Sequence, residues 1–189
     1  MAPTSPRLTI VLTCLLLTGA AAWAASESPY SGQQAREIKA LSSAEVQDLL
    51  AGKGMGLAKA AELNGYPGPS HALDLAAELG LSAEQVAALT GIHARMADAA
   101  KPLGAAIVEA ERALDRLFAE RRIDRAALDT ATAGIAALQG ELRAVHLAAH
   151  LETRAALGDG QAARYDALRG YAGGGTGKGH HGHGKSHGG

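Results

Sequence analysis

A heptad spacing of apolar residues between residues 83 and 121 constrains the fold of this chain more than any other feature of its sequence. Two interleaved series, each repeating every seven positions, hold mainly apolar side chains along this stretch. The series are Val86, His93, Ala100, Ile107 and Leu114, and Leu89, Met96, Leu103, Ala110 and Leu117. A sustained 3-4 spacing is typical of a long helix that packs along one seam against a second helix.

A second long helix is predicted from residue 124 onward. Ile123 and Leu128 flank Asp124 as a hydrophobic staple flanks a helix start. The apolar seam after this start consists of Leu128, Ile135, Leu138, Leu142, Val145 and Ala149. The link at residues 121–124 is short, so the two helices are expected to run antiparallel as a hairpin.

The composition agrees with an all-α protein. Of 189 residues, 43 are Ala and 25 are Leu, whereas aromatic residues make up 3%. Ala and Leu form helices well and strands poorly, and a core built from Ala is too small for a large enzyme. The formal net charge of −1 argues against a nucleic-acid partner. The acidic residues are spread over helix faces rather than paired, so we expect no enzyme activity.

The first 24 residues are typical of a secretory signal peptide. Arg7 precedes an apolar run, and Ala22-Trp23-Ala24 fits the cleavage rule. The alternative is an anchor helix, but the run is shorter than the roughly 20 residues that a membrane span needs. We therefore expect export and cleavage, which removes Cys14, the single cysteine. Residues 25–40 are expected to be a loose N-terminal segment.

Residues 41–171 are predicted to form one helical domain. The segments beginning at Leu41 and Leu81 share the pattern L-S-x-x-E/Q-V, in which Ser42 and Ser82 cap helices as capping boxes. Further short helices are expected over 57–63, over 71–79 with Ser70 as cap, and over 161–169. In the last of these Gly158 has no side chain that could cap, so Asp159 is expected to cap instead. Residues 172–189 carry only glycine, alanine and polar side chains, so they are expected to be a disordered tail.

Histidines in the second long helix point to metal binding. His146 and His150 lie one helical turn apart, a spacing that can chelate Zn²⁺, Ni²⁺, Co²⁺ or Cu ions. In an antiparallel hairpin His93 lies opposite this pair, with Met96 one turn later, so the four side chains could form one cluster. The alternative is that Met96 and the seam histidines fill the core. No other cofactor is expected.

A second set of histidines lies in the tail. It consists of His180, His181, His183 and His187. Imidazoles at this density bind transition metals weakly and without a fixed geometry. The alternative is a solubilising linker without a ligand.

The segment Leu81-Ser82-Ala83-Glu84-Gln85 resembles the L-T-x-x-Q signature of the Spy/CpxP family of bacterial periplasmic proteins, with Ser in place of Thr. Leu157-Gly158-Asp159-Gly160-Gln161 stands where that family has its second copy. The resemblance covers roughly residues 40–171. It implies an all-α hairpin that forms a cradle-shaped homodimer, and Leu147 and Leu151, which face away from the seam, favour a dimer as well.

We weigh three functions, each located in the periplasm, of which the resemblance implies the first two. The first is an ATP-independent chaperone or envelope-stress protein, whose partners are partly unfolded periplasmic proteins or a membrane-bound regulator. The second is a heavy-metal sensor or metal buffer that uses histidines, because the family also includes ZraP-type and CnrX-like members. The third is a structural helical adaptor without a ligand.

Overall fold

The computed structural model describes residues 28–172. The chain divides into two compact units, residues 1–32 and 33–189. The predicted signal peptide at 1–24 and the tail histidines, His180, His181, His183 and His187, lie outside the described residues.

The second unit is built from helices throughout its described part, which confirms the all-α prediction. A 3-10 turn at Gln33–Ala35 precedes seven α-helices. They are α1 (Ser43–Leu50), α2 (Lys59–Glu62), α3 (Pro69–Asp74), α4 (Ala76–Leu79), α5 (Ala83–Ala119), α6 (Arg125–Ala156) and α7 (Asp159–Leu168).

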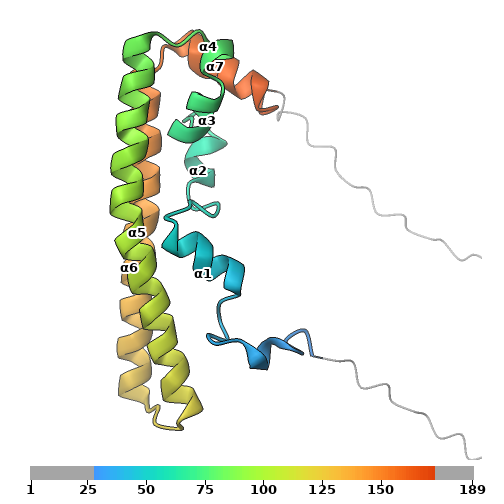
Figure 1. Cartoon of the computed structure of the whole chain (residues 1–189), viewed down its shortest axis with the longest axis vertical. Coiled ribbons are helices and arrows are strands. Elements are labelled where there is room, and N and C mark those ends of the chain that lie inside the picture. The colour runs from blue at the N-terminus through green and yellow to red at the C-terminus, as the bar shows by residue number, and fades with distance from the viewer. Residues whose placement is uncertain (1–27, 173–189) are drawn as a thin grey trace, which may run out of the picture. The chain divides into compact units, whose positions relative to one another are not determined.

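Helices α5 and α6 lie side by side and run in opposite directions (Figure 1). The turn between them contains Arg121 in the left-handed region, with φ 54°. Asp124 then caps α6, because its carboxylate accepts the Ala127 N–H at 2.8 Å. Ile107 and Leu142, both from the predicted seams, are each 2% exposed.

The shorter helices follow one another along one side of this pair (Figure 1). Helices α1 and α3 contact α5, α2 contacts α6, and α4 contacts α7. Ile38 is 2% exposed, and the Lys39 N–H donates to Asp115 of α5 at 3.1 Å. The end of the segment 25–40 therefore packs against α5 rather than lying loose.

The two predicted capping boxes at Ser42 and Ser82 are both present. At the second box the side chain of Gln85 does more than cap. Its amide donates to Gln161 Oε1 at 2.8 Å, and the amide of Gln161 donates back to Gln85 Oε1 at 3.0 Å. The segments 81–85 and 157–161 thus meet, and their glutamines link the start of α5 to the start of α7.

Two predicted caps are wrong. Helix α3 begins at Pro69 with Gly68 as its N-cap, not at Ser70, because proline lacks an N–H and its fixed φ suits a first helical turn. Asp159 does not cap α7. It pairs with Arg154 instead, and Gln161 accepts the free N–H of Gly158 at 2.9 Å.

None of the helices within residues 28–172 combines the length and the hydropathy that crossing a membrane requires.

Gly104 sets how closely α1 approaches α5, and this gives a prediction. A Cβ at residue 104 would lie 1.9 Å from the Leu49 carbonyl oxygen, a backbone atom. Gly104→Ala is therefore expected to lower the free energy of unfolding by about 1–3 kcal/mol. Gly134→Ala in α6 is the matched control, since nothing lies within 4 Å of its Cβ. That change should stabilise by about 1 kcal/mol in urea unfolding. Equal effects of the two changes would contradict the close approach.

Candidate functional site

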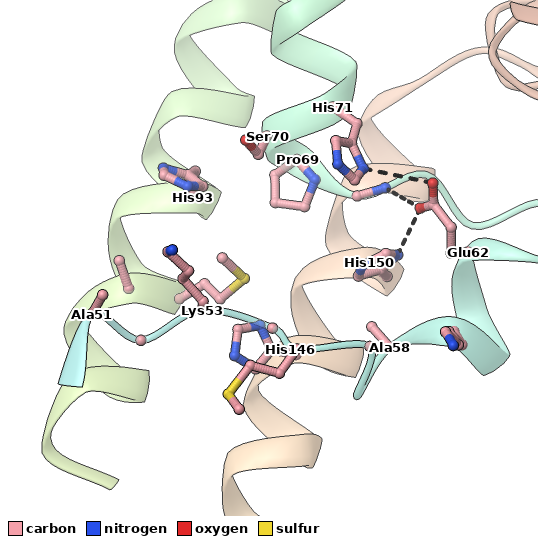
Figure 2. A pocket seen from close by; sticks show the side chains of 18 of the residues that line it. Ala51, Lys53, Ala58, Glu62, Pro69, Ser70, His71, His93, His146 and His150 are labelled. Carbon is pink, nitrogen blue, oxygen red and sulfur yellow. Dashed lines mark hydrogen bonds and ion pairs between the residues drawn. The ribbon is translucent and has the colours of Figure 1, made fainter. Parts of the chain in front are cut away.

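A cavity of about 690 Å³ lies between the loop at residues 51–56, helices α2 and α3, and the α5–α6 pair (Figure 2). Four histidines line it, namely His71, His93, His146 and His150. Glu62 and the thioethers of Met55 and Met96 line it as well. We call this cavity the histidine pocket. The four residues predicted from the helical hairpin, His93, Met96, His146 and His150, all contribute to it, whereas His71, Glu62 and Met55 were not predicted.

His150 is held by a backbone carbonyl. The residue is 9% exposed, and its Nδ1 lies 2.7 Å from the carbonyl oxygen of Tyr66. A carbonyl can only accept, so Nδ1 carries the proton and, in the neutral ring, Nε2 keeps its lone pair. A Cβ added to Gly68 would lie 3.1 Å from this Nε2. The glycine therefore leaves room beside the nitrogen that can bind a metal.

His146 lies one turn earlier on α6 and has no such partner. It is 3% exposed, and its Nε2 is buried without a hydrogen bond. Burial, and then the nearby His150, lower the pKa of His146 below its ordinary 6.5. The Gly54 backbone lies beside the ring, since a Cβ there would be 3.4 Å from Nδ1. His146 is therefore a neutral imidazole with free acceptor capacity.

Glu62 organises the other side of the pocket. Its Oε1 accepts hydrogen bonds from Tyr165 at 2.6 Å and Tyr171 at 3.1 Å, and its Oε2 accepts the Gly68 N–H at 3.2 Å. The Nδ1 of His71 lies 3.6 Å from Oε1, and the Nδ1 of His150 lies 3.7 Å from Oε2 (Figure 2). The carboxylate therefore accepts hydrogen bonds at both oxygens, two at Oε1 and one at Oε2.

The tyrosine that donates to Glu62 is held in its protonated form. Burial, followed by the hydrogen bond to Glu62, raises the pKa of Tyr165. Tyr165 is therefore a fixed donor at every pH at which the protein is handled. No sequence pattern singles out Glu62, because Lys59-Ala60-Ala61-Glu62 has the composition of an exposed helical turn.

The loop that closes the pocket has an unusual backbone. Gly52 and Gly56 have φ of 68° and 80°, and Met55 between them has φ 44°. Left-handed φ is uncommon for a side chain such as methionine. The loop lies against α5, because a Cβ at Gly52 would lie 3.2 Å from that of Ala100.

The pocket brings together side chains that can bind metals, but it does not arrange them around one point as a preformed metal site. Within residues 28–172, no three His, Cys, Asp or Glu side chains are placed to hold one metal ion. His146 faces Gly54, whereas His150 faces Tyr66 and Gly68. The predicted cluster therefore shares one cavity, and coordination by it stays a prediction.

Comparison with protein-family models, with curated proteins and with solved structures gives no match for this chain. A proposal for its function therefore depends on the chemistry of the histidine pocket.

The lowered pKa of His146 predicts a pH dependence of stability. Between that pKa and the ordinary value of 6.5, the unfolded chain binds a proton that the folded chain does not. The share of the unfolding free energy that depends on His146 being neutral is therefore complete above about pH 6.5, and it is lost as the pH falls toward the lowered pKa. Carboxyls such as Glu45, whose pKa is lowered from 4.5, act only at lower pH.

His146→Asn should therefore flatten the dependence of the unfolding free energy on pH in the range just below about pH 6.5. Urea titrations at several pH values in this range measure the slope of the unfolding free energy against pH. An identical slope in the variant and the parent would contradict the assignment.

Proposed function

We propose that this protein binds a transition-metal ion in the histidine pocket and acts in the periplasm as a metal buffer or sensor. One observation carries the proposal. His146, one turn before His150 on α6, is 3% exposed, and its buried Nε2 has no hydrogen-bond partner among the described residues. A buried imidazole nitrogen normally has a partner, so a missing one calls for a ligand.

The environment of His150 favours this chemistry. Histidines that bind metals usually donate their second ring nitrogen to a carbonyl or carboxylate, which fixes the tautomer and orients the ring. The Tyr66 carbonyl does this for His150. The low pKa of His146 also favours metal binding, because a metal ligand must be free of its proton.

Coordination requires a modest rearrangement. Since His146 and His150 face different loops, an ion shared by both requires at least one ring to turn into the cavity. His93 and Met96 from α5 also line this cavity and could complete the coordination. The expected Zn²⁺, Ni²⁺, Co²⁺ and Cu ions all accept imidazole nitrogen.

The proposal predicts stabilisation by metal in a chain whose tail cannot contribute. His180, His181, His183 and His187 are first replaced by Asn. At a metal concentration a hundredfold above Kd, binding to the folded state should add about 2.7 kcal/mol to the unfolding free energy. Differential scanning fluorimetry with Zn²⁺, Ni²⁺, Co²⁺ or Cu²⁺ measures the rise in Tm.

Replacing His150 by Ala in this background should remove the rise, and the metal-free Tm of the same variant is its reference. No rise with any of these metals, before His150 is changed, would rule out the pocket as a site for these divalent ions.

A chaperone that works as a homodimer is the second candidate. Large apolar side chains lie exposed among charges, as on surfaces that bind many different partners. Phe118 is 54% exposed and lines a cavity of about 490 Å³ together with Leu114, Glu111 and Asp115. Leu151, expected at a dimer interface, is 58% exposed.

This candidate predicts that the protein slows aggregation of an unfolded client without ATP. Phe118→Ser should reduce this protection at least severalfold, because it removes the largest exposed apolar side chain near the α5–α6 turn. Leu168→Ser is the matched control, because it makes the same kind of change at another exposed apolar side chain, which is 44% exposed and lies on α7. Light scattering of a chemically denatured client measures the effect. Full protection by the Phe118 variant would exclude this surface.

A further inference from the structure

The residues that line the histidine pocket fall into two groups by their hydrogen bonding. Glu62 and His150 are tied to neighbours, through Tyr165, Tyr171, Gly68 and the Tyr66 carbonyl. The buried Nε2 of His146 has no hydrogen-bond partner within the described residues, and Met55 and Met96, whose thioethers are only weak acceptors, line the same cavity. The untied group consists entirely of neutral, soft or intermediate ligands.

We infer that the pocket is built for a soft monovalent ion, Cu(I), bound by His146 together with the thioethers of Met55 and Met96. This inference rests on the proposed function and adds to it the kind of ion and the ligands. Thioether and imidazole ligands suit Cu(I), whereas Zn²⁺ takes thiolate, imidazole or carboxylate.

Met55 carries the first step of the argument. It is 45% exposed, so it does not fill the core, and with φ 44° it holds a backbone conformation that disfavours its side chain. Strain of this kind persists where the surrounding structure enforces it, often at binding sites. The adjacent Gly54 lies against the His146 ring. The loop therefore brings a thioether to the wall that already holds the unpartnered imidazole.

The single carboxylate that lines the pocket is the second step. Both oxygens of Glu62 already accept hydrogen bonds, and Arg169 lies 3.5 Å from Oε1. A divalent ion that used Oε1 would have to displace the tyrosine donors, whereas Oε2 accepts only the Gly68 N–H and keeps acceptor capacity. An ion bound by His146 and the two methionines displaces none of them.

Charge on the pocket wall is the third step. Lys53, Lys59, Lys101 and Arg169 line the cavity together with Glu62. Lys53 is paired with Asp48 and largely exposed, so solvent screens much of its field. Lys59, Lys101 and Arg169 are exposed as well, and Arg169 is paired with Glu62. The excess of positive charge is therefore screened, but what remains opposes a divalent ion twice as strongly as a monovalent one at the same position.

The test is an anaerobic titration with Cu(I), in competition with a chromophoric Cu(I) chelator, and a parallel titration with Zn²⁺. The protein is the full chain with Asn at the four tail histidine positions. Met55→Leu combined with Met96→Leu removes both sulfur atoms while keeping apolar volume, so the fold should be retained. His150→Ala is the matched variant, because it changes a residue of the group that is hydrogen-bonded to its neighbours.

The methionine double variant should weaken Cu(I) binding by more than about tenfold and leave Zn²⁺ binding unchanged. X-ray absorption of the copper-loaded parent should show sulfur neighbours that the variant lacks. Unchanged Cu(I) affinity in the variant, or a copper centre without sulfur in the parent, would overturn the inference while metal binding by the pocket stands. Absence of binding of both ions in the parent would overturn the proposed function itself.

Discussion

The buried carboxylate of Glu62 joins segments that apolar packing alone would hold weakly. An alanine-rich core buries little area per residue, so the short helices beside the α5–α6 pair gain little from hydrophobic burial. Glu62 in α2 accepts hydrogen bonds from Tyr165 in α7 and from the Gly68 N–H before α3. A buried charge that loses its partners destabilises a fold by several kcal/mol. The wall of the histidine pocket depends on this one group.

The long helices could be predicted because their signals are local and repeated. The heptad spacing defined α5 and α6, and the capping boxes at Ser42 and Ser82 are present as expected. The short turn between the two helices also placed His93 opposite His150, and both line the same cavity. For these residues, periodicity and one turn were sufficient to place ligands from separate helices together.

The rest of the site depends on contacts between distant residues, which no local pattern reveals. Glu62 meets Tyr165 across 103 residues of chain, and its own turn of helix looks exposed. Met55 reaches the pocket because glycines on both sides allow a left-handed loop. The caps predicted at Ser70 and Asp159 were wrong for a local reason, since Pro69 takes the first position of α3 and Asp159 pairs with Arg154, which lies 5 residues earlier in the chain.

The hydrogen-bonded and the unpartnered residues of the pocket would have different consequences if they bound an ion, and this distinguishes a sensor from a buffer. A sensor needs an ion that favours one conformation over another. An ion that took Oε1 of Glu62 would release Tyr165 and Tyr171, and would thereby loosen α7 and the segment after it. An ion on His146 and the two methionines leaves these bonds in place. Binding by the untied group therefore fits storage or transfer of the ion, whereas binding by the tied group would turn the pocket into a switch for α7.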